Sequence, residues 1–451
     1  MEKYVPIINK MEDNSKFLGQ YLYVNVGATV ASSESGGFVK KDVVCEEPVG
    51  NAKKFIQGTN VGRWYFDWEG EWLDYRPDEM SGPRHSEMFE GEKLLVRKRT
   101  DKGGWIAAAY DDEGMYCDDT VLVCCDYDIL KDTGATLDFE GFERLDEDLD
   151  LPYAVALLNS TLMTWLFKNK FETGGLQGTY SDVWPQSVRS FPIPDTDGKD
   201  YPVNEWANNA LTVFPNRQAN EIEKTETPQE LVSVLSEHVI EAVKEQRELN
   251  LNILDYLSIP GDELPDSMTG DSLGDIQIPV EGAADTPITE TTKNFDSLRV
   301  EGVSFEDDGR LLMTVDISYK PDEDDSRETD TWGRLVDEEF ETYDALAFVG
   351  LSKETETLIR NFVPAAVEKG NGFAGFRKGA TKTNSPLDRL KDLKLPDIEI
   401  VRNGLERYTE VKSHAEELDE MMEETGQLID EIIYDLYDLT DEEVEIVESA
   451  V

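Results

Sequence analysis

Histidine and cysteine, the side chains that most often bind transition metals, are scarce in this 451-residue chain. The histidines are scattered, all cysteines lie in the first 125 residues, and no two cysteines form a Cys-x-x-Cys pair. This spacing fits neither a zinc site nor a Ser/His/Asp or Cys/His catalytic arrangement. We expect buried or half-buried thiols in a reducing compartment. The residues concerned are Cys45, Cys117, Cys124, Cys125, His85, His238 and His414.

Positive charge is also in short supply. The chain has 43 Lys and Arg against 96 Asp and Glu, which gives a formal net charge of −53. In dilute buffer this repulsion would strain the compact state, whereas at about 1 M salt the screening length falls to about 3 Å. A cytoplasm of molar salt, as in halophilic archaea, is therefore the expected environment. The alternative, an acidic disordered chain, is disfavoured because aromatic residues make up 10% of the sequence.

Long hydrophobic runs are missing. The most apolar stretch, YAVALLNSTLMTWLF at residues 153–167, is shorter than the roughly 20 residues of a membrane-spanning helix, and Asn159 and Ser160 interrupt it. The opening MEKYVPIINKMEDNSK is mixed and charged, unlike a secretory signal. We expect a buried helix at 153–167 in a cytoplasmic protein without a membrane partner.

Motifs that carry chemistry are incomplete. The string GNGFAG at 370–375 has GxGxxG spacing, but VPAAVEK before it is typical of a helix, whereas a nucleotide loop follows a strand. Pro77-Asp78 and Lys93 resemble a PD…(D/E)xK nuclease pattern, which fails at Gly91. The chain has no Pro-Pro dipeptide, so it lacks the motif with which amino-methyltransferases hold a flipped base. We expect no catalytic residue, cofactor or metal in this chain.

The first 200 residues predict one α+β domain. From about Phe17 to Asp128, short alternating segments are bounded by Gly, Asp or Pro turns, which is typical of strands. Prolines at 185, 192, 194 and 202 exclude a continuous helix after the apolar stretch. The expected strands lie in QYLYVNVGATV, NVGRWYFDW, EKLLVRKR, GWIAAAYDD and MYCDDTVLVCCDYD.

Two long amphipathic helices are predicted, at about 228–257 and 404–437, because apolar residues recur there at intervals of three and four. Thr440 and Glu443 form a capping box that opens a last short helix. Neither long helix can bury its apolar stripe alone. An antiparallel pair closing around the intervening module is one arrangement, and docking onto different partners is the other.

The region between these helices predicts a linker and a small module. Residues 260–294 are rich in Pro, Gly, Asp and Thr without periodicity, which favours a solvated linker. Asp308-Gly309 lies between two alternating runs and predicts a hairpin, and a helix is expected at 353–368. We divide the chain into a recognition domain (1–200), a long helix with connector (201–258), an acidic linker (259–295), a small α/β module (296–395) and the C-terminal helices (396–451).

Two basic islands stand out in the acidic background. The first is VRKRTDK at 96–102, and the second runs from Arg377 to Lys394. Charge runs usually form a solvated face, but cations retained beside glycines and aromatics also fit phosphate contacts. Both interpretations stay open at this point.

The first 200 residues resemble the TaqI-like C-terminal specificity domain, the target-recognition module of adenine-specific DNA methyltransferases and type IIG restriction–modification enzymes. The resemblance rests on the order of several landmarks, and the ending IDEIIYDLYDLTDEEVEIVE is similar to the tail of type IIG enzymes. The landmarks are YLYVNVGATVASSESGGFVKKDVV, KKFIQGTNVGRWYFDW, SEMFEGEKLLVRKR, AAAYDDEGMYCDDTVLV, YAVALLNSTLMTWLF and SFPIPD.

This resemblance implies a scaffold role for residues 153–167, which correspond to a helix that packs under the recognition sheet. In fused enzymes the methyltransferase domain lies upstream of these landmarks, and this chain starts almost at the recognition domain. It therefore looks like a split specificity subunit or a truncated remnant. We expect S-adenosylmethionine in a separate catalytic partner, which would be a methyltransferase, an endonuclease or both.

The expected function is recognition of a short sequence in double-stranded DNA. The alternative is a protein-interaction subunit of a restriction or phage-defence complex that does not itself contact DNA. Cations are candidates for phosphates or guanine edges, and amides and aromatics for bases. The predicted DNA-binding residues are Gln57, Asn60, Arg63, Trp64, Tyr65, Arg97, Lys98, Arg99, Lys102, Arg377, Lys378 and Lys382.

Overall fold

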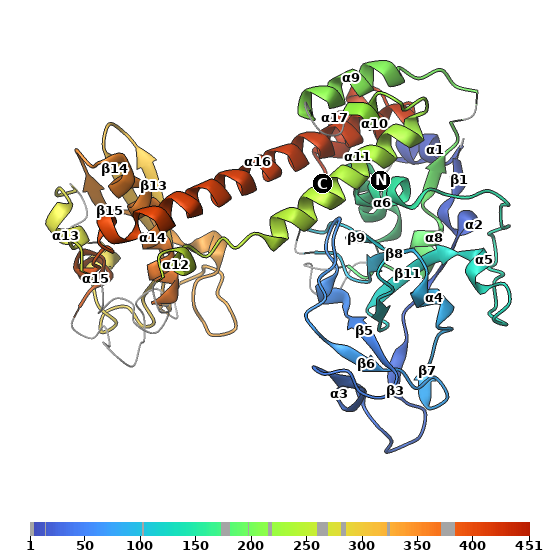
Figure 1. The fold of residues 1–451 in the computed structure, drawn as a ribbon, viewed down its shortest axis with the longest axis horizontal. Helices are drawn as coiled ribbons and strands as arrows, with labels where there is room; N and C mark the ends of the chain where they lie inside the picture. The colour runs from blue at the N-terminus through green and yellow to red at the C-terminus, as the bar shows by residue number, and fades with distance from the viewer. Residues whose placement is uncertain are drawn as a thin grey trace. The chain divides into compact units, whose positions relative to one another are not determined.

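The computed structural model describes residues 4–13, 15–101, 103–172, 181–196, 198–214, 219–258, 269–280, 286–322, 325–370 and 384–451. Its contacts divide the chain into two compact units, each treated separately below (Figure 1). Unit 1 comprises Met1–Glu248 and Glu417–Val451, and unit 2 comprises Leu249–Glu416. The chain contains helices and several sheets, which confirms the predicted α+β class. No helix among the described residues is both long enough and apolar enough to cross a bilayer.

A four-stranded antiparallel sheet lies at the centre of unit 1. Its order is β2 (Leu22–Val26), β11 (Val121–Asp126), β8 (Lys93–Arg97) and β9 (Ala108–Asp111). Successive side chains of a strand point to opposite faces, and in β11 both sets are buried. Leu122 and Cys124 belong to one core cluster, whereas Val121, Val123 and Cys125 belong to another. The sheet is therefore covered on both faces, which explains the unbroken apolar run VLVCC.

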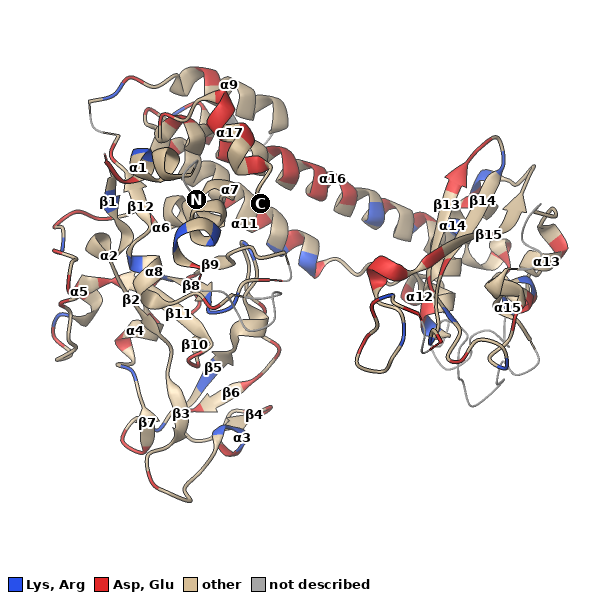
Figure 2. Cartoon of the chain, turned by 180° about the vertical axis from the view of Figure 1, so that it is seen from behind, with Lys and Arg blue, Asp and Glu red and all other residues tan. Residues whose placement is uncertain are grey.

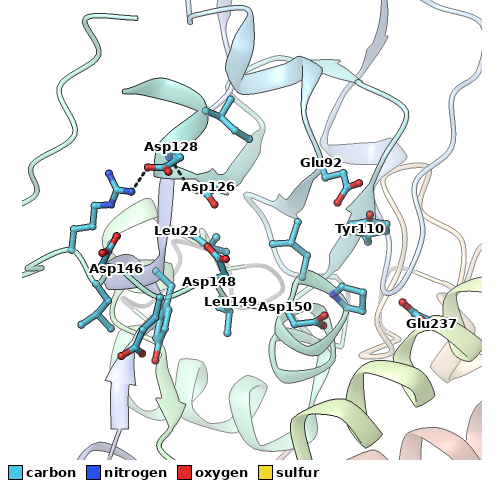
Figure 3. Close-up of a pocket in the computed structure, with 17 residues that line it drawn as sticks. Leu22, Glu92, Tyr110, Asp126, Asp128, Asp146, Asp148, Leu149, Asp150 and Glu237 are labelled. Carbon is cyan, nitrogen blue, oxygen red and sulfur yellow. Dashed lines mark hydrogen bonds and ion pairs between the residues drawn. The ribbon is translucent and has the colours of Figure 1, made fainter. Parts of the chain in front are cut away.

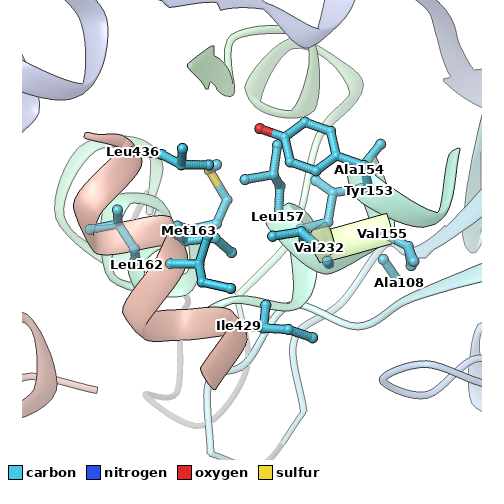
Figure 4. Packing of buried hydrophobic residues seen from close by; sticks show 14 of the residues in the cluster. Ala108, Tyr153, Ala154, Val155, Leu157, Leu162, Met163, Val232, Ile429 and Leu436 are labelled. Carbon is cyan, nitrogen blue, oxygen red and sulfur yellow. The ribbon is translucent and has the colours of Figure 1, made fainter. Parts of the chain in front are cut away.

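Helices cover the first face of this sheet. Residues 153–167 are buried as predicted, except half-buried Thr161. They form two helices, α6 (Leu151–Asn159) and α7 (Thr161–Leu166), followed by a π-helical turn (Phe167–Phe171). The expectation of one helix is corrected at Ser160, whose Oγ accepts a hydrogen bond from the Met163 N–H at 3.1 Å and so starts a new helix. Figure 4 shows side chains from α6, α7, α11 and α16 meeting in this core.

Asn159 joins α6 to the sheet. Its amide nitrogen donates to the Ala108 carbonyl at 2.9 Å, and its amide oxygen accepts from the Ala108 N–H at 3.0 Å. Both groups of the fully buried side chain are thus satisfied by the backbone of edge strand β9. The polar residue that interrupts the apolar stretch therefore fixes the helix against the sheet.

A second lobe covers the other face of the sheet. It contains the sheet β10 (Tyr116–Cys117), β5 (Ala52–Ile56), β6 (Trp72–Asp74), β4 (Val44–Cys45) and the pair β3 (Thr29–Ser32) and β7 (Met80–Gly82). Cys117 and Cys125 are buried here, and Cys45 is half-buried, as predicted for structural thiols. Burial raises the pKa of the Cys125 thiol to about 12, which keeps it protonated and unreactive.

The rest of unit 1 consists mainly of helices. The short strands β1 (Ser15–Phe17) and β12 (Pro192–Pro194) pair beside them. The predicted capping box is confirmed at the start of α17, where Thr440 Oγ1 accepts from the Glu443 N–H. The helices are α1 (Val5–Asp13), α2 (Leu18–Tyr21), α3 (Lys40–Val43), α4 (Glu87–Glu90), α5 (Tyr127–Leu130), α8 (Pro185–Arg189), α9 (Val203–Val213), α10 (Ala219–Ile222), α11 (Pro228–Glu248) and α17 (Asp441–Glu448), with the 3-10 turn η1 (Gly58–Asn60).

The first long helix is shorter than predicted. Helix α11 ends at Glu248 rather than near residue 257, and a separate short helix, α12 (Ile253–Tyr256), follows. Asparagine causes the break: Asn250 Oδ1 accepts from the Asn252 N–H, and Asn252 Oδ1 accepts from the Leu254 N–H. These local bonds compete with helical hydrogen bonds and open α12.

Unit 2 is built around the antiparallel sheet β13 (Arg299–Asp307), β14 (Leu311–Ser318) and β15 (Glu341–Phe348). The predicted hairpin is confirmed, since Gly309 connects β13 and β14 with φ +91°. Leu273 and Ile288, within the predicted linker, are buried in the core of this unit, so that part of the segment is packed rather than solvated. The remaining elements are α13 (Leu273–Ile276), η3 (Pro287–Thr289), η4 (Asp337–Glu339), α14 (Lys353–Lys369) and α15 (Pro386–Asp392).

The second long helix, α16 (Ile398–Leu436), begins earlier than predicted and contributes residues to both units. Gly404 lies inside this helix, although glycine is unfavourable in a helix interior. A Cβ at this position would meet the Tyr256 carbonyl oxygen at 2.2 Å, so glycine is required by a close backbone approach within unit 2. Five segments assigned from composition thus correspond to two packed units, because tertiary contacts join residues far apart in the sequence.

Candidate nucleic-acid interface

The first basic island follows directly from strand β8, which ends at Arg97. The next residue is held by backbone bonds on both sides: the Lys98 N–H donates to the Thr120 carbonyl at 3.0 Å, and the Lys98 carbonyl accepts from the Val183 N–H at 2.7 Å. The Thr100 N–H donates to the Ser181 carbonyl at 3.0 Å. The backbone of the island therefore extends the hydrogen bonding of the sheet, which fixes the positions from which its side chains project.

A concave surface, which we call the basic hollow, surrounds these cations. It has a volume of about 350 Å³. Three of its lining side chains are cationic and one, Asp182, is a carboxylate, so the hollow is positive in a strongly acidic protein. Its lining residues are Gln57, Gly58, Thr59, Arg97, Lys98, Arg99, Thr120, Asp182 and Trp184.

The cations of the basic hollow are largely available to a ligand. Arg99 is 64% exposed, and its Nε lies 3.5 Å from Asp182, a surface pair of little energetic weight. Lys98 Nζ lies 5.0 Å from the centroid of the Trp184 ring, and this tryptophan is 47% exposed. Among the described residues, no carboxylate lies within ion-pair distance of Arg97 or Lys98.

The side of the basic hollow formed by Gly58 and Thr120 is closely packed. The Gly58 N–H donates to Thr120 Oγ1 at 2.8 Å, and a Cβ at Gly58 would meet the Thr120 carbonyl oxygen at 2.8 Å. Asn60, one of the predicted base-contacting residues, is buried, and its amide oxygen accepts from the Gln57 N–H at 2.8 Å. The buried Asn60 side chain therefore stabilises the conformation of its own loop.

Gln57 lies at the basic hollow, but both ends of its amide are engaged. Its Oε1 accepts from Lys40 Nζ at 2.5 Å, and its Nε2 donates to Glu71 Oε2 at 3.0 Å. Lys40 also pairs with Asp118. Each end of the amide keeps one further hydrogen-bonding position, so a base contact by Gln57 does not require either bond to break.

Trp184 is held in place by the short helix α8 that follows it. Arg189, at the end of α8, donates from Nε to the Val24 carbonyl of β2 at 3.1 Å, and its guanidinium lies 3.5 Å from the Phe139 ring centroid. Burial lowers the pKa of Arg189. The exposed indole thus projects from an anchored helix.

Arg63, Trp64 and Tyr65 lie away from the basic hollow. Arg63 donates from Nη2 to the Asn159 carbonyl at 2.7 Å, its guanidinium lies 4.3 Å from the Trp105 ring centroid, and burial lowers its pKa. Trp64 and Tyr65 line a separate groove beside helix α11. The cations Lys102, Arg377, Lys378 and Lys382 lie outside the residues that the structure describes.

Unit 1 also contains a hollow of the opposite charge, which we call the acidic hollow. It has a volume of about 870 Å³, and Figure 3 shows its carboxylates around the opening. Arg144, its one cationic lining side chain, is paired with Asp128. Burial, and after it the nearby carboxylates, raise the pKa of Glu237. The carboxylates are those of Glu92, Asp126, Asp128, Asp146, Glu147, Asp148, Asp150 and Glu237.

Acidic side chains are distributed unevenly over the chain. Figure 2 shows Asp and Glu along helices α16 and α17, whereas the strands of the central sheet are mostly without charge. A phosphate backbone would be repelled by the acidic hollow and by these helices. The basic hollow therefore offers the better approach for a polyanion among the described surfaces of unit 1.

The nuclease-like pattern does not form a site: Pro77 and Asp78 are exposed, whereas Lys93 is buried in the core. Lys93 and Asp111 are both fully buried, with Lys93 Nζ 2.5 Å from Asp111 Oδ2. The same carboxylate accepts backbone N–H bonds from Glu113, Gly114 and Met115. In the described ranges, no group of three or more His, Cys, Asp or Glu is arranged to hold a metal ion.

Thr59, Thr120 and Trp184 also line the basic hollow, although the sequence did not predict them as site residues. The first two are exposed polar residues, one in η1 and the other in the turn before β11, that only the fold brings beside the basic island. Trp184 offered a weak signal, since it precedes Pro185 at a helix start, but nothing local places it against Lys98.

One comparison with known families bears on this region. Residues 53–193 match the model of the TaqI-like C-terminal specificity domain. The match points to the DNA-specificity part of restriction–modification enzymes, and it spans every lining residue of the basic hollow. The chain has no significant match among curated proteins.

Proposed function

We propose that unit 1 is the DNA-recognition part of a restriction–modification system and that it reads a short duplex sequence at the basic hollow. In this proposal a separate chain, which binds S-adenosylmethionine or carries a nuclease centre, performs the reaction. The observation that carries the proposal is the grouping of Arg97, Lys98, Arg99 and exposed Trp184 inside the matched specificity domain.

Each side chain would have a distinct role. Arg97 and Lys98, which have no carboxylate partner in the described structure, are suited to guanine edges or phosphates. Arg99 would exchange its weak surface pair with Asp182 for a phosphate. Trp184 would stack on a base or a deoxyribose, a contact worth about 1–3 kcal/mol when a base stacks on an aromatic ring.

Salt sets the balance between these contacts. If the protein works in molar salt, as its charge of −53 favours, counterion release supplies little affinity. Bidentate hydrogen bonds, at about 1–3 kcal/mol each, and stacking must then carry more of the binding. The proposal thus predicts stronger sequence discrimination than a binder that relies on phosphates alone.

The test is the affinity of the full-length chain for duplex DNA, measured by fluorescence anisotropy in molar KCl. Arg97→Ala/Lys98→Ala/Arg99→Ala should weaken the preferred duplex by at least about tenfold, the equivalent of one lost specific contact. The matched control, Lys131→Ala/Lys170→Ala/Lys199→Ala, removes the same charge from cations outside the basic hollow. Equal effects of the two triple variants would contradict the proposal and favour an interaction subunit that does not touch DNA.

A further inference from the structure

The groove that contains Trp64 and Tyr65 has a character opposite to that of the basic hollow. Five half-buried aromatic rings form one wall of this aromatic groove, whose volume is about 560 Å³. Clustered, partly exposed rings of this kind are uncommon on a surface that binds nothing. The rings belong to Trp64, Tyr65, Phe66, Trp68 and Tyr110.

Helix α11 forms the other wall. The residues that face the groove recur at intervals of three and four, so they make one stripe along the helix. The opposite side of α11, which includes Leu235 and Val239, is buried in the core. From residue 237 to residue 248 the stripe is about 16 Å long, enough to contact several residues of an extended segment. The stripe consists of Glu237, Ile240, Glu241, Lys244, Arg247 and Glu248.

The groove carries an excess of negative charge. Its lining contains two cations and six carboxylates. Two of these carboxylates are already paired, Asp67 with Arg247 and Glu113 with Lys54. Arg247 also lies 3.8 Å from the Tyr65 ring centroid. Within the described part of the chain, no cation lies within ion-pair distance of Asp112, Glu237 or Glu241. Burial and the neighbouring Glu92 raise the pKa of Tyr110 to about 12.

A costly backbone conformation presents the aromatic wall. Trp64 has φ +74°, in the left-handed region that bulky residues avoid. It is held there by a tight hairpin in which the Gly62 N–H donates to the Tyr65 carbonyl and the Trp64 N–H donates to the Ala108 carbonyl, both at 2.9 Å. Strain of this kind concentrates at binding surfaces.

We propose that the aromatic groove docks a segment of the catalytic partner chain in which Lys or Arg flanks a large apolar side chain. The rings and Ile240 would bury the apolar anchor, and the free carboxylates would pair with its flanking cations. DNA does not fit, because its phosphates would face these carboxylates. The identity of the partner rests on the proposed function, whereas the chemistry of the docked segment does not.

The test measures the affinity of the full-length chain for three fluorescein-labelled hexapeptides by fluorescence anisotropy. Molar KCl is present to screen non-specific electrostatic attraction. The probe is Lys-Leu-Lys-Trp-Leu-Lys. One control peptide has Glu in place of Lys, and the other has Ser in place of Leu and Trp. The probe should bind at least about tenfold more tightly than either control peptide. Equal binding of all three would overturn the proposal.

Protein variants locate the binding. Glu237→Lys/Glu241→Lys should weaken the probe by at least about tenfold, whereas Glu417→Lys/Glu420→Lys, the same charge change at exposed positions of α16, should leave it unchanged. Circular dichroism verifies that both variants fold. Equal losses in the two pairs would overturn the docking site.

Duplex DNA separates this proposal from the first. Glu237→Lys/Glu241→Lys should keep sequence-specific DNA binding, and Arg97→Ala/Lys98→Ala/Arg99→Ala should keep peptide binding. If peptide binding persists in a chain that never binds DNA, the groove stands and the proposed function falls. If Glu237→Lys/Glu241→Lys removes DNA binding while the peptide still binds, the assignment of the groove to a protein partner is wrong.

Discussion

Strand β8 carries cations at both ends, and the two ends use them in opposite ways. At its start Lys93 is fully buried, paired with Asp111 and bonded to the Phe89 carbonyl. At its end Arg97 lies at the basic hollow, followed by Lys98 and the 64% exposed Arg99. A buried charge must be paired, whereas an exposed one can exchange partners. Lys93 is therefore a structural cation that stabilises the sheet, whereas Arg97, Lys98 and Arg99 are available to bind a ligand.

The largest expected effect is at the buried end. Asp111→Ala should lower the free energy of unfolding by about 3–5 kcal/mol, because Lys93 would remain buried without a counter-charge. Urea denaturation followed by circular dichroism measures the loss. The double variant Lys93→Met/Asp111→Ala should recover part of the stability, since no unpaired charge remains. A loss below about 1 kcal/mol in the single variant would show that the pair is not structural.

The next effect concerns the exposed end. Trp184→Ala should weaken the preferred duplex by about 1–3 kcal/mol through lost stacking, while stability changes by less than about 0.5 kcal/mol because the indole is half exposed. Trp184→Phe, which retains a ring, should restore most of the affinity. Anisotropy titrations and urea denaturation provide the two readouts. A lower free energy of unfolding with unchanged affinity for the duplex would show that Trp184 has a structural role and does not contact DNA.

A smaller effect is expected on the pH dependence of the free energy of unfolding, through the buried His238. Burial lowers the pKa of His238, which lies against the Phe214 ring and 3.6 Å from Glu221, with Glu241 also acting on it. Its folded pKa is below the unfolded value of about 6.5, so at lower pH the unfolded chain binds a proton that the folded chain resists. His238 should thus cost stability as pH falls below about 6.5, by up to about 1.4 kcal/mol per pH unit.

The comparison of wild type with His238→Gln isolates this contribution from the many titrating carboxylates. Urea denaturation at pH 7.5 and at pH 5.5 should show a larger loss of stability on acidification in wild type than in the variant. A larger loss in the variant would reverse the sign and imply that His238 is protonated in the folded state.

The smallest expected effect is on the pair between Arg99 and Asp182. Asp182→Asn should change the free energy of unfolding by less than about 0.5 kcal/mol, because both side chains are exposed. Removing this carboxylate should also tighten duplex binding slightly, since it leaves the basic hollow more positive. A destabilisation comparable to that of Asp111→Ala would erase the difference between the two ends of β8.

Local signals in the sequence predicted local structure well. The hairpin at Gly309 and the capping box at Thr440 each depend on a few neighbouring residues, and both are confirmed. Burial of residues 153–167 followed from composition, but the break at Ser160 did not, because it depends on a side-chain cap and on the sheet contact of Asn159.

Tertiary contacts limited what could be predicted of the site. Arg97, Lys98 and Arg99 were found as a charge run, and the fold places them together because they are consecutive. Arg63 looked equivalent as a cation beside aromatics, yet it donates to a helix carbonyl about a hundred residues away. Trp184 reaches the basic hollow only through the pairing of residues 181–183 with the end of β8.

The most direct test of DNA reading is selection from a pool of random duplexes by the full-length chain in molar KCl. Wild type should enrich one short sequence, and Arg97→Ala/Lys98→Ala/Arg99→Ala should lose that enrichment. A selected pool that stays random, or one that is enriched equally by the triple variant, would contradict sequence recognition at the basic hollow.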